Sequence, residues 1–129
     1  MFDTIIRGGT VIDGTGRPGF SADVGITAGK IAAVGALSAA PASRVIDASG
    51  RVVTPGFIDI HRHADAAAFR PGYGELELRQ GLTTIVNGNC GLSAAPFGPA
   101  HAAAVRAYLR PITGDIPADM PSASMADYL

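Results

Sequence analysis

The sequence changes its pattern at Pro55-Gly56, and this change limits the folds that the chain can adopt. Before it, short apolar runs alternate with glycine-containing turns such as Gly8-Gly9 and Ala28-Gly29. This is typical of short β-strands joined by tight turns, because glycine adopts positive φ without steric cost. After it, strand-like and helix-like segments alternate, which indicates βα units with parallel strands. We therefore expect a small, incomplete β-domain over residues 1–55 and the first βα units of an incomplete α/β domain over residues 56–129.

The first region is predicted to be a β-meander. Its expected strands are Thr4 to Arg7, Thr10 to Ile12, Ala22 to Thr27, Lys30 to Val34, Arg44 to Asp47 and Arg51 to Thr54. Lys30 to Val34 should pair antiparallel with the strand before it. Four carboxylates stand at strand ends or turns, where they cap backbone amides or face solvent; they are Asp3, Asp13, Asp23 and Asp47. We assign them a structural role.

The second region begins with a predicted strand, helix and strand over Phe57 to His61, Glu75 to Gln80 and Leu82 to Asn87. Such a unit implies parallel, neighbouring strands with a right-handed crossover. An alanine-rich helix is expected over Ala100 to Arg110. The segment from Ser122 to Leu129 should begin another helix, capped at Ser124.

Two histidines stand two positions apart in the stretch from Gly56 to Asp65. In an extended strand, side chains alternate between faces, so Asp59, His61 and His63 would share one face. Ile58 and Ile60 would lie on the other face, packed under helices. Because neutral imidazole is the commonest metal ligand of proteins, the pattern favours a strand that lines a metal site, although paired histidines also occur on exposed strands.

Cys90 follows the second predicted strand, between Gly88 and Gly91. Carboxyl ends of parallel strands meet at one edge, and neighbouring strands lie about 4.8 Å apart, so this cysteine can approach His61 and His63. A thiolate and two imidazoles are donors that Zn²⁺ prefers. As the chain's one cysteine, Cys90 could instead be a buried hydrophobe or a reactive thiol.

Other polar residues near this edge have alternative interpretations. Asp65 could accept a hydrogen bond from a histidine Nδ1–H or be an ordinary loop carboxylate. Asn87 and Asn89 could orient a substrate, but Asx-type turns explain them better. His101, at the start of the alanine-rich helix, has no evident partners and is expected at the surface.

Composition excludes several classes of partner. The 129 residues are 47% hydrophobic and 16% charged, which provides enough apolar material for a core. The net charge is −1 and the basic residues are scattered, so we expect neither nucleic acid nor a membrane surface as a partner. The N-terminus has no basic and apolar leader pattern, and we expect a cytoplasmic protein.

Several motifs resemble one known family. They are Ile6 to Gly16, Asp23 to Ile26, Lys30 to Gly35, Val53 to His63, Gln80 to Val86 and Gly88 to Gly91. Together they are similar to the N-terminal part of the amidohydrolase superfamily, and most similar to its N-acyl-D-amino-acid deacylases, or D-aminoacylases. The resemblance covers residues 2 to about 98. The Gly-Asn-Cys-Gly motif is the most selective. Arg62 and Ile60 replace the small residue and the serine that are frequent in the family.

The resemblance implies a fold and a site. The fold is a small β-sandwich, completed by strands from the far C-terminus, followed by a metal-dependent (β/α)8 barrel. Cys90 would take the place of the metal-bridging carboxylated lysine of dihydroorotase-like relatives, and His61 and His63 would serve the second, weaker metal position. Two further histidines and an aspartate, the general acid/base, would come from later strands.

The implied function is zinc-dependent hydrolysis of small-molecule N-acyl-D-amino acids to a carboxylate and a D-amino acid. Since a (β/α)8 barrel takes about 250 residues, we expect this chain to be a fragment that lacks its C-terminal partner segment and is inactive alone. One alternative is a cyclic-amide hydrolase of the dihydroorotase or hydantoinase kind, against which Cys90 argues. The other is a non-catalytic metal-binding or structural protein.

Overall fold

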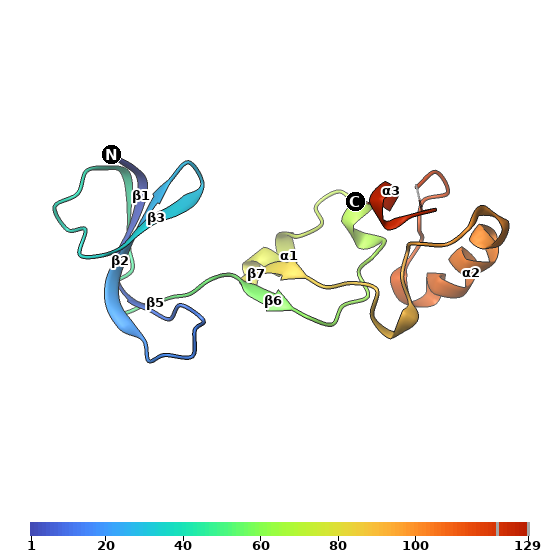
Figure 1. Ribbon diagram of the computed structural model, residues 1–129, viewed down its shortest axis with the longest axis horizontal. Coiled ribbons are helices and arrows are strands. Elements are labelled where there is room, and N and C mark those ends of the chain that lie inside the picture. The colour runs from blue at the N-terminus through green and yellow to red at the C-terminus, as the bar shows by residue number, and fades with distance from the viewer. Residues whose placement is uncertain (121, 129) are drawn as a thin grey trace. The chain divides into compact units, whose positions relative to one another are not determined.

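The structure is a computed structural model that describes residues 1–120 and 122–128 (Figure 1). The chain divides into two compact units, Met1–Pro55 and Gly56–Leu129. The division falls at the proline and glycine where the sequence pattern changes. Leu129, the last residue of the expected C-terminal helix start, lies outside the described residues.

The first unit is one mixed sheet. Its strands are β1 (Phe2–Val11), β2 (Phe20–Thr27), β3 (Lys30–Gly35), β4 (Ala42–Asp47) and β5 (Val52–Val53). The order is β3-β2-β1-β4, and β5 also pairs with β1. The pairs β1–β2 and β2–β3 are antiparallel, as a meander requires, but β4 and β5 both run parallel to β1. The meander prediction is therefore wrong for the last two strands, because the ten-residue β1 accommodates both along one edge.

The predicted break at Gly8-Gly9 is also wrong. β1 continues through both glycines, and its register with β2 shifts between Ile6 and Gly9. Gly8 has a φ of 75°, and a Cβ at Gly9 would collide with the side chain of Val53. The glycines thus form an irregularity inside a strand rather than a turn between strands.

The four carboxylates of this unit accept backbone hydrogen bonds, as predicted. Asp23 joins two segments, because Oδ1 accepts from the Gly8 amide at 2.8 Å and Oδ2 from the Leu37 amide at 2.9 Å. These two bonds lower the pKa of Asp23. Asp13 accepts from the Thr15 hydroxyl and amide and from Arg17, which lowers its pKa to about 2. Asp3 accepts from Ala28 and Asp47 from Ser49.

The second unit contains the expected strand, helix and strand. The parallel strands are β6 (Phe57–Asp59) and β7 (Leu82–Ile85), and α1 (Glu75–Arg79) lies between them in the chain. The later helices are α2 (Ala102–Thr113), which continues through Pro111 beyond its predicted end, and α3 (Met125–Tyr128). Short 3₁₀ turns span Ala67–Phe69, Asn89–Gly91 and Pro99–His101. No helix among the described residues is long and apolar enough to cross a membrane.

The core of the second unit forms around α2. Buried Leu109 packs with Ala66 and Ala94, and with Ile116 and Met120 from the segment after the helix. The capping prediction for α3 is confirmed, since Ser124 Oγ accepts from the Asp127 amide at 3.1 Å and donates to its carboxylate at 2.7 Å.

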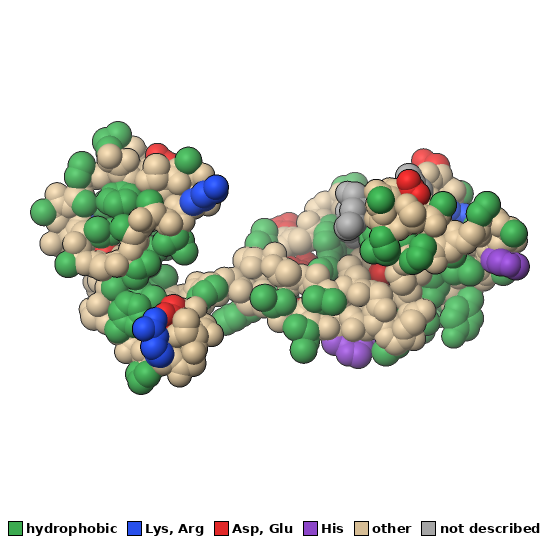
Figure 2. Space-filling model, in the orientation of Figure 1, with side chains coloured by type: hydrophobic (Ala, Val, Ile, Leu, Met, Phe, Trp, Pro, Cys, Tyr) green, Lys and Arg blue, Asp and Glu red, His purple; other side chains and the backbone are tan. Residues whose placement is uncertain are grey.

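The aliphatic side chains of Ile58 in β6 and of Ile60, just after β6, are not packed under helices. Ile58 is 61% exposed and Ile60 is 74% exposed, and hydrophobic side chains are visible over much of the surface in Figure 2. α1 has five residues, none of them buried. It is therefore too short to cover this face, and the expected covering is not supplied by the described residues.

We predict that Asp23→Asn lowers the unfolding temperature of the first unit by several degrees, because an amide in that place can accept from only one of the two N–H groups. A carboxyl with a lowered folded-state pKa stabilises the fold above its ordinary pKa of about 3.9, and this stabilisation is lost as the pH falls through the lowered value. The loss on acidification should therefore be smaller in the variant. NMR signals of β1 and β2 during thermal unfolding at pH 6 and pH 3 measure both effects. Lys30→Gln is the control, and equal pH dependence in Asp23→Asn and wild type would contradict the prediction.

Candidate metal centre

The two histidines lie in a loop and not on a strand. β6 ends at Asp59, whose Oδ1 accepts a hydrogen bond from the His61 amide at 3.0 Å. The Asp59 side chain thereby occupies a backbone donor that a continuing strand would use. The prediction that Asp59, His61 and His63 share one strand face is therefore wrong, and the loop brings the imidazoles together instead.

Cys90 lies in a tight 3₁₀ turn that follows β7. Its φ and ψ are 59° and 19°, in the left-handed region, and Gly88 and Gly91 on either side also have positive φ. A residue other than glycine in this region costs about 1–3 kcal/mol and is often found at functional sites. In this strained conformation, the sulfur of Cys90 points towards the histidine loop.

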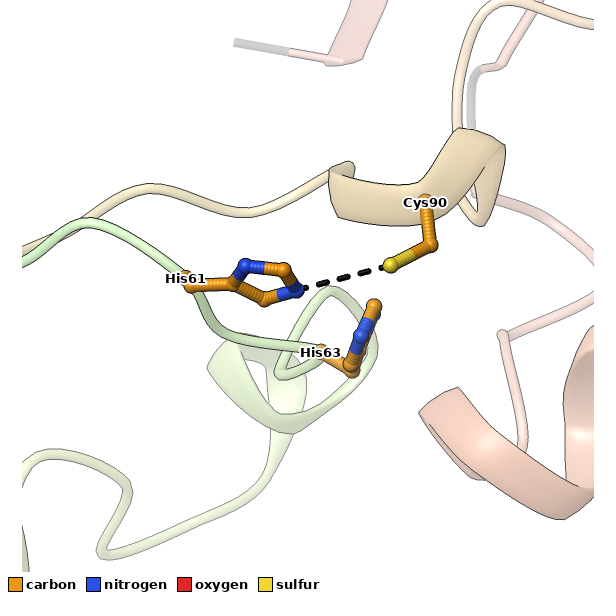
Figure 3. Close-up of side chains that lie close together, drawn as sticks. All are labelled: His61, His63 and Cys90. Atoms are coloured by element: carbon orange, nitrogen blue, oxygen red, sulfur yellow. Dashed lines mark hydrogen bonds between the residues drawn. The ribbon is translucent and has the colours of Figure 1, made fainter.

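The three predicted ligands come together (Figure 3). The Cys90 Sγ lies 3.4 Å from His61 Nε2. One potential ligand atom from each of His61, His63 and Cys90 lies within 4.8 Å of the others. The two imidazole rings meet edge to face, with centroids 5.5 Å apart. Two segments that are distant in sequence thus present two nitrogens and a sulfur to one point.

This donor set fits zinc. Tetrahedral zinc ligands, bound at about 2.0–2.3 Å, lie about 3.3–3.8 Å from one another, and the distance from Cys90 Sγ to His61 Nε2 falls in that range. His63 Nδ1 is buried and has no hydrogen-bond partner among the described residues. His61 and Cys90 are exposed. The described residues therefore present three potential ligand atoms in a cluster that is exposed on one side.

Among the described residues, no hydrogen bond joins Asp65 to a histidine. Its side chain is 1% exposed, and Oδ1 accepts from the Ala94 amide at 3.4 Å. Its backbone oxygen accepts from the Tyr128 hydroxyl at 3.2 Å. Burial and the Asp65 carboxylate raise the pKa of Tyr128. Asp65 is thus a loop carboxylate that joins the histidine loop to the segment after Cys90.

The remaining candidates also have definite places. His101 is exposed and is not in the cluster, as expected. Arg62 pairs with Glu77 of α1 at 2.7 Å. Asn87 and Asn89 bond to the backbone of the histidine loop, so the interpretation as local turns missed their reach. In the sequence, the feature that pointed to a role of these two asparagines at the site was their position shortly before Cys90.

Comparison with known proteins identifies the family. The sequence profile described as "Amidohydrolase family" matches residues 44–124. The chain belongs to the amidohydrolase family. It is 52% identical over 122 residues to an N-acyl-D-glutamate deacylase of Alcaligenes xylosoxydans xylosoxydans, an alignment that covers 92% of this chain and 24% of that protein.

Two solved amidohydrolase structures are also similar. A D-aminoacylase, described as having a binuclear metal centre, matches with a TM-score of 0.78 and 44% identity over 100% of this chain and 26% of its own. An N-acyl-D-glutamate deacylase from Bordetella bronchiseptica, in complex with zinc and a phosphonate inhibitor, matches with a TM-score of 0.72 and 42% identity, covering 95% of this chain and 26% of its own. The mixed sheet and few helices of this chain match the N-terminal part of D-aminoacylase, and the chain spans about a quarter of the length of these relatives.

We predict that cobalt(II), a spectroscopic substitute for zinc, gives a thiolate-to-metal charge-transfer band when added to the chain. Cys90→Ser should abolish the band, because it removes the sulfur donor, and His61→Ala or His63→Ala should weaken cobalt binding about tenfold or more. Absorbance titration measures both effects. His101→Ala is the matched control, and a loss of affinity there as large as at His61 would contradict the assignment of the site.

Proposed function

We propose that this chain contributes three metal ligands, His61, His63 and Cys90, to a zinc-dependent amidohydrolase that cleaves N-acyl-D-amino acids. The observation that carries the proposal is the approach of the Cys90 sulfur to His61 across the ends of two parallel strands. A cysteine in that place distinguishes the site from one built around a bridging lysine. The 52% identity to an N-acyl-D-glutamate deacylase supports the substrate class.

Zinc supplies Lewis acidity when bound, since it polarises a carbonyl oxygen and lowers the pKa of water towards about 7. His61, His63 and Cys90 of this chain would hold the ion. The two imidazoles donate neutral nitrogen ligands, and the Cys90 thiolate adds a negative charge that strengthens binding of a dication. The open side of the cluster leaves room for a substrate amide and for metal ligands from later strands of a longer polypeptide.

The proposed architecture extends beyond these residues. We infer that β6 and β7 are the first two strands of a (β/α)8 barrel and that the mixed sheet of Met1–Pro55 is half of a small β-sandwich. Sites in such barrels lie at the carboxyl ends of the strands, where His61 and Cys90 lie. Two further histidines and an aspartate that moves the proton would come from later strands of a longer polypeptide. We place the protein in the cytoplasm.

Two alternative functions make different demands on the sequence. A cyclic-amide hydrolase of the dihydroorotase kind expects a lysine where Cys90 lies. A non-catalytic metal-binding or structural protein would need no further ligands. The nucleotide sequence that follows the codon for Leu129 separates the non-catalytic protein from the enzymes, because the proposal requires an open frame that encodes the later histidines and aspartate.

We predict that the 129-residue chain alone binds zinc weakly and does not hydrolyse N-acyl-D-amino acids, because the proposed site takes further histidines and the proton-transfer aspartate from later strands. Elemental analysis after dialysis against a weak chelator should find much less than one zinc per chain. Retention of stoichiometric zinc would contradict this expectation.

We further predict that the chain, produced together with the polypeptide encoded downstream, releases D-glutamate or another D-amino acid from its N-acetyl derivative. Cys90→Ser should lower kcat/KM at least about 100-fold, because it weakens the hold on the metal. An amine-release assay with the L-enantiomer as control measures the reaction. Equal turnover of both enantiomers, or turnover of a hydantoin alone, would reject the proposed substrate class.

A further inference from the structure

One asparagine side chain joins the two segments that carry the candidate ligands. Asn89 Nδ2 donates to the backbone oxygen of Arg62 at 3.2 Å and to that of Val86 at 2.7 Å. Arg62 lies between His61 and His63 in the chain, and Asn89 precedes Cys90. One amide group thus ties the histidine loop to the end of β7 and to the cysteine turn.

A second asparagine makes the reciprocal contact. Asn87 Oδ1 accepts a hydrogen bond from the Ala64 amide, the residue after His63, at 3.1 Å. The contacts of Asn87 and Asn89 therefore fall on both sides of His63, one through a donor and one through an acceptor. We call these two side chains the asparagine clamp.

Other hydrogen bonds among the described residues also hold the two segments together, and one of them joins the Ala94 amide to Asp65, beyond the two ligand motifs. Beyond the strand ends, the Val86 amide donates to the Asp59 oxygen at 2.8 Å and the Arg62 amide donates to the Val86 oxygen at 3.1 Å. Both of these fix the start of the histidine loop, before His63. The clamp extends the connection to Ala64 and to the turn that contains Cys90.

The clamp also acts on the strained turn that contains Cys90. Cys90 holds a left-handed conformation that a residue other than glycine tends to leave. Asn89 is fixed by its two side-chain bonds, and its own carbonyl accepts from the Leu92 amide at 3.0 Å, closing the turn around Cys90. Release of the Asn89 side chain would free the turn to relax and move the sulfur away from His61.

We propose that Asn89, assisted by Asn87, is a positioning residue that presets the arrangement of His61, His63 and Cys90 before any metal binds. Its consequence for metal affinity rests on the proposed function, whereas the hydrogen bonds of the clamp join protein atoms only. The clamp acts through the backbone and does not contact the metal.

The test compares wild type with Asn89→Ala and Asn89→Asp in the metal-free 129-residue chain. Asn89→Asp keeps the shape of the side chain but removes its donor and places a carboxylate against two carbonyl oxygens. This variant therefore distinguishes the effect of hydrogen bonding from the effect of side-chain shape. The readout is the nuclear Overhauser effect between the His61 ring and the Cys90 β-protons. We expect it in wild type and expect its loss in both variants.

The controls exclude a general loss of structure. Gln80→Ala removes a side-chain amide that donates to the Leu76 oxygen at 3.0 Å outside the site, and the contact between His61 and Cys90 should survive there. Amide signals of Asp59 and Val86 report whether β6 and β7 remain paired. If Asn89→Ala unfolds the unit, Asn87→Ala, which removes one bond only, should weaken the contact with the pairing intact.

Cobalt(II) titration of the same proteins provides the second readout. Removal of groups that orient metal ligands weakens affinity about 10- to 100-fold, and we expect about tenfold for the Asn89 variants and no change for Gln80→Ala. Persistence of the His61–Cys90 contact in both Asn89 variants, or its absence from wild type, would contradict the proposal that Asn89 positions these ligands. If the His61–Cys90 contact behaves as expected in a chain that binds no cobalt, metal binding by these three residues in the 129-residue chain is contradicted, and the positioning role of the asparagines stands.

Discussion

The parallel pairing of β6 with β7 is the interaction on which the candidate site depends. The two strands are short, but the pairing continues beyond their ends through the bonds of Val86 with Asp59 and of Arg62 with Val86. Because parallel strands finish at the same edge, this pairing brings a histidine loop and a cysteine turn together although they are nearly thirty residues apart in the chain. The approach of the Cys90 sulfur to His61 follows from that edge.

The site is placed where the backbone is least regular. β6 stops at Asp59 because the carboxylate takes the amide that would extend the strand, and Cys90 adopts a conformation that is costly without glycine. Loops at the ends of rigid strands commonly carry function, since the strands fix their positions while the loops are free to present side chains. The histidine loop and the cysteine turn have this relationship to β6 and β7, with Asn89 joining them.

Local pattern in the sequence was sufficient to predict most elements but not all of their pairing. The strand–helix–strand order around Glu75 and the meeting of His61, His63 and Cys90 follow from periodicity and from the rule that parallel strands end together. The parallel course of β4 and β5 beside β1 was not predictable, because Gly8-Gly9 resembles a turn between two short strands, whereas β1 continues through both glycines and pairs with β4 before them and with β5 after them. The role of Asn89 was missed for a similar reason: its partners lie on a distant segment.

The most direct test of the account is X-ray absorption at the zinc edge, with the chain in excess over zinc. The account predicts one sulfur neighbour at about 2.3 Å and nitrogen neighbours at about 2.0–2.1 Å that show imidazole scattering. A first shell made only of oxygen and nitrogen, without sulfur, would contradict the central claim that Cys90 and the histidine pair form one metal centre.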